Sequence, residues 1–169
     1  LSRLSGLPVV ERAAIVHLEP FHGGTPVAFW RRPAESTPPK EIAILTLVGP
    51  GYFEAAGTRL LRGRTFQTTD RRGAEPVAIV NDAMARLISP DANVVGLCVP
   101  FDSQVRRGGC SHVVGVVESQ GRSYLDDEPE PRVFLPWAQA SNAVQFGAPS
   151  LVVRTRNPAR DAAAVRAVL

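Results

Sequence analysis

Short runs of apolar residues alternate with polar, proline-rich and glycine-rich segments along most of this chain. The runs predict strands, because each is short and rich in branched aliphatic residues. The predicted strands cover residues 9–18, 27–30, 42–48, 77–80, 133–135 and 151–155. Two further runs, 97–101 and 112–118, flank the polar segment 102–109 and predict a hairpin with a long loop.

Three short helices are expected between and after these strands. A Gly-Pro-Gly turn ends the third strand and precedes a helix in which Tyr52 and Phe53 lie close to one apolar face. Asn81 is the predicted N-cap of a second helix, and Asn157, followed by a proline, begins the third. Strands mixed with a few short helices predict an α+β fold.

The length and the apolar content limit the class of protein. With 169 residues, 44% of them apolar, the chain can bury the core of one domain or of two small lobes. No apolar run reaches the roughly 20 residues that a membrane-spanning helix needs, and the first residues lack the pattern of a signal peptide. The chain begins without methionine and stops within a predicted helix, so we expect a soluble segment of a longer polypeptide.

The net charge of +3 comes from scattered arginines. The densest group is Arg59, Arg62 and Arg64, and the only aromatic residue near it is Phe66. Nucleic-acid binding is favoured by basic residues on one stripe with interleaved aromatic side chains that stack on bases, so no nucleic-acid partner is predicted. Asp70 follows this group and is predicted to pair with a nearby arginine.

The two cysteines, Cys98 and Cys110, lie at opposite ends of the predicted hairpin, twelve positions apart. Cross-strand pairing that places them opposite each other would bring their Cα atoms within disulfide range, so we predict a disulfide. A disulfide indicates an oxidising compartment. Two buried free thiols remain an alternative, and a zinc site that adds His112 is a third, although it lacks a closely spaced ligand pair and a clear fourth ligand.

Candidate catalytic and metal-binding motifs are incomplete. Residues 109–113 approach the Gly-x-Ser-x-Gly nucleophile elbow, but Val113 replaces the second glycine. His17 and His22 have no serine or aspartate partner that the sequence reveals, and the acidic residues within 126–130 lack the spacing of a calcium loop. A phosphate-binding loop is also missing, so we expect neither catalysis nor a cofactor.

Several sequence blocks, in a fixed order, carry a family resemblance. Residues 44–66 read ILTLVGPGYFEAAGTRLLRGRTF and are followed by Asp70, and residues 76–96 read PVAIVNDAMARLISPDANVVG. Later blocks are VVGVVES at 113–119, EPEPRVFLPWAQ at 128–139 and LVVRTRNPARDAAAVRAVL at 151–169. Over nearly its whole length the chain resembles the extracytoplasmic core domain of MacB/FtsX-like ABC transporter permeases.

The resemblance implies a two-lobed domain. A porter-like lobe would combine residues 1–24 with 146–169, and a mainly β middle lobe would comprise residues 25–145. The domain would lie at the periplasmic or extracytoplasmic face of a bacterial inner membrane, tethered by transmembrane helices of the parent permease. In such a permease, which forms a homodimer, a cytoplasmic ATPase drives motion that the extracytoplasmic domains relay to a substrate or partner protein.

Contact residues are therefore the candidate functional residues. Tyr52, Phe53, Arg62, Arg64 and Trp137 are predicted to contact a partner, although the first two also suit a core and the arginines also suit ion pairs. The alternative function is a small secreted α+β enzyme or ligand-binding domain. Such a protein would need a concave pocket with convergent polar groups.

Overall fold

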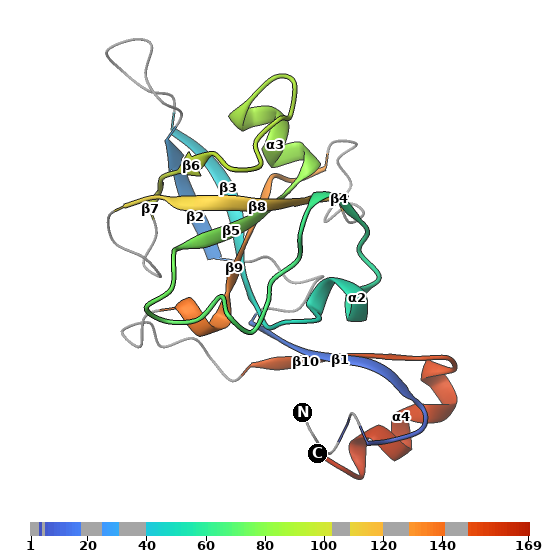
Figure 1. Ribbon diagram of the computed structural model, residues 1–169. Helices are drawn as coiled ribbons and strands as arrows, with labels where there is room; N and C mark the ends of the chain where they lie inside the picture. The colour runs from blue at the N-terminus through green and yellow to red at the C-terminus, as the bar shows by residue number, and fades with distance from the viewer. Residues whose placement is uncertain are drawn as a thin grey trace.

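The computed structural model describes residues 4, 6–17, 25–30, 40–102, 109–119, 129–140 and 149–169. They form one curled sheet accompanied by short helices (Figure 1), so the predicted α+β fold is confirmed. The strands are β1 (Val10–His17), β2 (Thr25–Trp30), β3 (Lys40–Val48), β4 (Leu60–Gly63), β5 (Val77–Asn81), β6 (Cys98–Val99), β7 (Phe101–Asp102), β8 (Ser111–Val117), β9 (Arg132–Pro136) and β10 (Ser150–Thr155). The helices are α2 (Tyr52–Ala56), α3 (Asp82–Ile88) and α4 (Pro158–Arg166), and η1 (Trp137–Gln139) is a 3-10 turn.

The main path through the sheet runs β10-β1-β3-β9-β5-β8-β4. The pairs β3–β9 and β5–β8 are parallel, whereas β5 and β9 pair antiparallel at the centre. Every residue of β5 and of β9 is buried. Strands covered on both faces need apolar side chains at nearly every position, which explains their continuous apolar runs.

Alternate residues of the central strands contribute to two separate clusters. In β5, Ala78 and Val80 belong to a cluster that α3 covers, whereas Val77 and Ile79 belong to a cluster that α2 covers. Successive side chains of a strand point to opposite faces, so the central sheet has one core on each side.

The predicted hairpin between 97–101 and 112–118 is only partly right. Cys98 and Val99 pair with β8, but Phe101 and Asp102 leave that ladder and pair with β2. Pro100 lies between the two short strands and lacks the N–H group that a continuous ladder requires. The single strand predicted at 97–101 is therefore β6 and β7, which face different partners.

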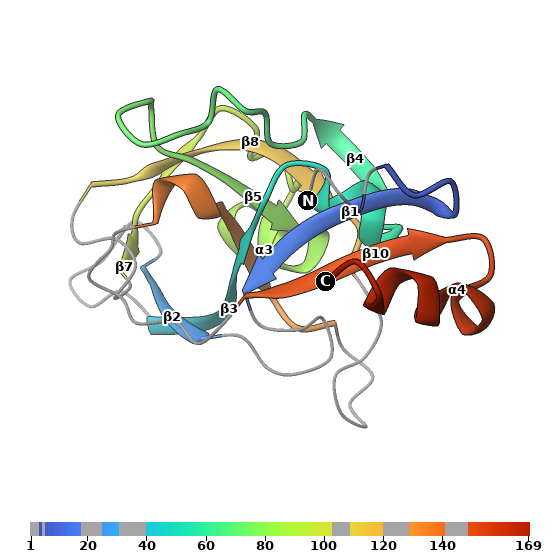
Figure 2. The same cartoon turned by 90° about the horizontal axis from the view of Figure 1, so that it is seen from below.

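The strands near the two chain ends lie side by side. β1 and β10 pair antiparallel from Val10–Thr155 to Val16–Ser150, and α4 follows β10 (Figure 2). β1 then meets β3 over two residue pairs, Val16–Val48 and His17–Leu47. We call β1, β10 and α4, with the residues that connect β10 to α4, the end unit, and the described residues between 25 and 140 the body. Among the described residues, no helix is long and apolar enough to cross a membrane.

Candidate functional site at the junction

The region where the end unit meets the body is built around α2. The turn 49–51 that the sequence predicted does end β3, and Tyr52 and Phe53 of α2 are 1% and 2% exposed. The Phe53 ring lies edge-on to that of Phe134 with a centroid distance of 5.1 Å, and 6.2 Å from that of Phe66. Burial raises the pKa of Tyr52, so its phenol stays neutral. Tyr52 and Phe53 are core residues of the junction and present almost no surface to a partner.

The end unit is attached to this core by packing and by hydrogen bonds. Ala14 and Val16 of β1 are fully buried in the cluster under α2. The Gly49 N–H donates to the Ile15 carbonyl at 2.9 Å, and Arg154 Nε donates to the Ala55 carbonyl at 3.3 Å. The junction is therefore a packed interface as well as a continuation of the sheet.

The predicted pairing of Asp70 with an arginine is confirmed. Arg64 Nη1 and Nη2 donate to the two carboxylate oxygens of Asp70 at 2.8 and 3.0 Å, and the Gln67 N–H donates to Asp70 Oδ2 at 2.8 Å. The hydrogen bonds from Arg64 lower the pKa of Asp70 more than its burial raises it. At neutral pH Asp70 is an ionised structural anchor and a poor proton acceptor.

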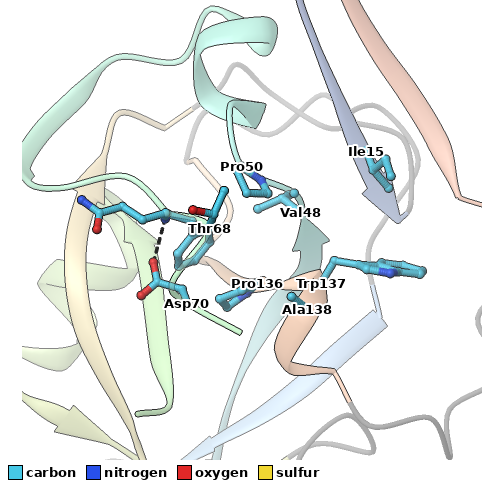
Figure 3. A pocket seen from close by; sticks show the side chains of 11 residues that line it. Ile15, Val48, Pro50, Thr68, Asp70, Pro136, Trp137 and Ala138 are labelled. Carbon is cyan, nitrogen blue, oxygen red and sulfur yellow. Dashed lines mark hydrogen bonds between the residues drawn. The ribbon is translucent and has the colours of Figure 1, made fainter. Parts of the chain in front are cut away.

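A pocket of about 150 Å³ lies at the junction, with Asp70 among the residues of its wall (Figure 3). Its walls come from β1, the β3–α2 turn, the segment after β4, and the end of β9 with η1. They consist of Ile15, Val48, Gly49, Pro50, Phe66, Gln67, Thr68, Asp70, Pro136, Trp137 and Ala138. This pocket could not be predicted from the sequence, because its walls come from four segments far apart in the chain.

Trp137, a predicted contact residue, lines this pocket and is half-buried. Its ring lies 5.7 Å from the ring of His17, between centroids, with the planes tilted by 34°. His17 is 6% exposed, and burial lowers its pKa, so the imidazole is neutral at pH 7. The pair forms a second link between β1 and the body, while His22 lies outside the described residues.

Arg62, the remaining predicted contact residue, lies away from the junction on β4. Its guanidinium donates to the Ala92 carbonyl. All residues of β4 are exposed, including Leu60 at 37% and Leu61 at 39%. The sequence did not predict β4, because an exposed edge strand lacks the apolar pattern that marks a buried one. Partner contact stays a prediction for Arg62, Arg64 and Trp137.

The predicted disulfide between Cys98 and Cys110 is present, with a Cα–Cα distance of 5.4 Å. The register expected for it is wrong, because His112 rather than Cys110 lies opposite Cys98. The bond excludes the alternatives of free thiols and of a zinc site that uses both sulfurs. The described residues contain no group of three or more potential metal ligands, and of the acidic segment 126–130 only residues 129 and 130 are described.

Residues 109–113, whose sequence nearly matches a nucleophile elbow, do not form one. Ser111 lies within β8 and is 1% exposed, whereas an elbow would display the serine on a sharp turn after a strand. Within the described part of the chain, the groups around the pocket are mostly apolar, and its carboxylate is held by Arg64. The arrangement suits packing and apolar contact better than acid–base chemistry.

Residues 3–169 match the family described as the MacB-like periplasmic core domain. Three solved structures have a similar fold. The periplasmic region of MacB from Actinobacillus actinomycetemcomitans has a TM-score of 0.62 and 17% identity, over 99% of this chain and 68% of that one. The extracellular domain of the noncanonic ABC-type transporter YknZ from Gram-positive bacteria has a TM-score of 0.59 and 17% identity, over 96% and 74%.

A domain of a putative permease protein from Porphyromonas gingivalis has a TM-score of 0.56 and 15% identity, over 99% of this chain and 67% of that one. Identities this low show similarity of fold alone. A comparison with curated protein sequences gives no significant match.

Proposed function

The chain belongs to the MacB-like periplasmic core domain family, and we propose that this extracytoplasmic domain of an ABC transporter permease relays ATP-driven motion without catalysing a reaction. The motion would originate at a cytoplasmic ATPase and enter through transmembrane helices of the permease. It would pass through this domain, in a permease homodimer, to a substrate or to an extracytoplasmic partner protein.

The observation that carries this proposal is the construction of the junction. Val10 and Thr155 pair at the outer end of the end unit, so both flanking segments leave the sheet at the same place. From there β1 runs into the buried cluster under α2, and its last two residues pair with β3. Packed cores respond to displacement as solids rather than as liquids, so a movement of the end unit would carry the body with it.

We further propose that the two units correspond to two lobes, formed by residues 1–24 with 146–169 and by residues 25–145. The pairing of β1 with β10 supports the discontinuous lobe, because it unites both chain ends. Proteolysis tests the boundaries, since exposed connections between lobes are cleaved before paired strands.

The relay is tested in the full-length permease with its ATPase, in lipid nanodiscs. The disulfide occupies both native cysteines of this domain. One spin label is placed in the body by Glu75→Cys and, in a second sample, in the end unit by Arg156→Cys, because both side chains are exposed, at 69% and 90%. Distances between the two labels of the homodimer are measured with and without a non-hydrolysable ATP analogue.

We expect the ATP analogue to shift both distance distributions. A shift at position 156 without a shift at position 75 would contradict the relay, since the motion would then end at the junction. An unchanged distribution at both positions would contradict it as well.

The absence of catalysis is tested separately with the 169-residue chain. Screens for hydrolase and nucleotidase activity are expected to give no turnover. Reproducible turnover that is lost on His17→Ala or His112→Ala would favour the alternative of an enzyme.

A further inference from the structure

We propose that the junction pocket binds the apolar ring of a neutral small molecule about the size of benzene to indole. Binding at this pocket does not depend on the proposed relay, because it needs only the pocket itself. The pocket measures about 150 Å³. An apolar cavity of about this volume in another protein stays dry and takes up benzene, which sets the size of ring that fits.

The pocket combines a buried floor with an open rim. Val48 and Phe66 of the floor are 0% and 5% exposed and belong to the cluster under α2. Pro50, Thr68 and Ala138 at the rim are exposed. A ring can thus enter from solvent and lie against core side chains, where burial of its apolar surface provides the main driving force.

The charges of the residues that line the pocket favour a neutral ligand. Among the described residues that line the pocket, Asp70 is the only one with an ionisable side chain. Both of its oxygens accept hydrogen bonds from Arg64, and one also accepts from the Gln67 N–H. A charged ring of either sign would lose hydration against these mostly apolar walls without gaining an unpaired counter-charge, because Arg64 already neutralises Asp70. A neutral ring does not incur this cost.

Because the pocket lies at the junction, a bound ligand would affect how firmly the end unit is held to the body. Ile15 comes from the end unit, whereas Phe66 and Trp137 come from the body, so a bound ring touches both sides of the junction. The hydrogen bond from Gly49 to the Ile15 carbonyl lies within the same wall. A ligand that binds only while the two sides of the junction are packed together stabilises that packing by mass action, so occupancy should slow opening of this hydrogen bond.

The test is a titration of the isotope-labelled 169-residue chain with indole, followed by the chemical shifts of the backbone amides. We expect saturable shifts at Gly49, Gln67, Thr68 and Ala138, and slower hydrogen exchange of the Gly49 amide. Benzylammonium and benzoate, which carry a charge on a similar ring, should bind at least about fivefold more weakly, a difference of about 1 kcal/mol.

Two alanines provide a matched pair of variants. Ala138→Phe fills the rim and should weaken indole binding at least about tenfold, whereas Ala74→Phe adds the same ring at an exposed position outside the pocket and should leave binding unchanged. Thr68→Phe replaces Ala138→Phe if that variant loses its native spectrum. The proposal is overturned by non-saturable shifts, by equal binding to the Ala138→Phe and Ala74→Phe variants, or by tighter binding of either charged ring.

Discussion

The Asp70 carboxylate is 7% exposed, and its partner Arg64 is 40% exposed. The pair closes a turn that places Phe66 in the core and Gln67 and Thr68 at the rim of the pocket. A half-exposed arginine alone would contribute little. The two parallel hydrogen bonds and the additional amide donor make Asp70 the more consequential partner.

We predict that Asp70→Asn lowers the free energy of unfolding by about 1–3 kcal/mol at pH 7, because it removes hydrogen bonds to a buried charge. The pKa of Asp70 is lowered in the folded state, so its stabilising effect is complete above the ordinary carboxyl pKa and is lost as pH falls through the lowered value. Urea unfolding at pH 7 and at about pH 2 should show a difference between wild type and variant that shrinks in acid. The control Glu75→Gln removes an exposed carboxylate and should change little. A difference that is the same at both pH values would contradict the assigned role.

The second prediction at this scale concerns Cys98 and Cys110. Replacing both by serine should lower the free energy of unfolding by about 3 kcal/mol, since the disulfide closes a short loop in the unfolded chain. Unfolding of the oxidised protein, the reduced protein and the double variant provides the measurement. Alkylation followed by intact mass determination checks the bond, and two reactive thiols in unreduced protein made under oxidising conditions would refute it.

Helix α3 is held at its N-terminus by the side chain of Asn81. Asn81 is 2% exposed, and its Oδ1 accepts from the backbone N–H groups of Met84 and Arg132, both at 2.9 Å. Its Nδ2 donates to Ser119 Oγ at 3.0 Å and to the Glu130 carbonyl at 2.7 Å. The predicted helix cap is thus also the link between α3, the end of β8 and the start of β9.

Asn157 is the matched control, because it is an exposed asparagine that caps α4 by accepting from the Arg160 N–H at 3.3 Å. We predict that Asn157→Ala costs about 1 kcal/mol and that Asn81→Ala costs at least about twice as much, since buried partners are left unsatisfied. Thermal unfolding of both variants tests this. Equal losses would mean that Asn81 acts as a cap alone.

Two glycines, Gly63 at the end of β4 and Gly73 in the segment before β5, provide a second matched pair of variants. Both have positive φ angles, 74° and 83°. A Cβ at Gly63 would collide with the Val114 carbonyl oxygen and lie 2.9 Å from the Gly115 Cα, whereas nothing lies within 4 Å of a Cβ at Gly73. We predict that Gly73→Ala costs about 1–2 kcal/mol and that Gly63→Ala costs more and weakens the pairing of β4 with β8. Denaturant unfolding gives the energies and amide exchange of β8 gives the pairing, and a Gly63→Ala loss no larger than that of Gly73→Ala would contradict the collision.

For the molecule as a whole, burial decreases from the body to the outer part of the end unit. β5 and β9 are buried throughout, whereas β10 and α4 contain no fully buried residue. Local opening requires less free energy where fewer apolar contacts are lost. Among the described elements, β10 and α4 should therefore open locally at a lower cost in free energy than β5 and β9.

We predict that backbone amides in β10 and α4 exchange with solvent at least about tenfold faster than those in β5 and β9, after correction for intrinsic rates. Native-state hydrogen exchange followed by NMR measures both sets in one sample. Protection that is uniform across the four elements would indicate a single cooperative unit and would contradict a stability difference that follows burial.

The sequence alone determined the features that depend on neighbours along the chain. The apolar runs became strands, Asn81 and Asn157 became helix caps, and the turn before Tyr52 ended β3, because propensity, capping and chain reversal act over a few residues. The family resemblance added the fold, since it rests on the order of many such blocks.

Only the tertiary structure decided which surfaces meet. The buried positions of Tyr52 and Phe53, the division of residues 97–101 between β8 and β2, and the pocket beside Trp137 all depend on segments that are distant in sequence. The hydrophobic effect has no direction, so an apolar pattern specifies that a side chain is buried but not against which partner. Partner choice follows from register and packing, which exist only once the chain has folded.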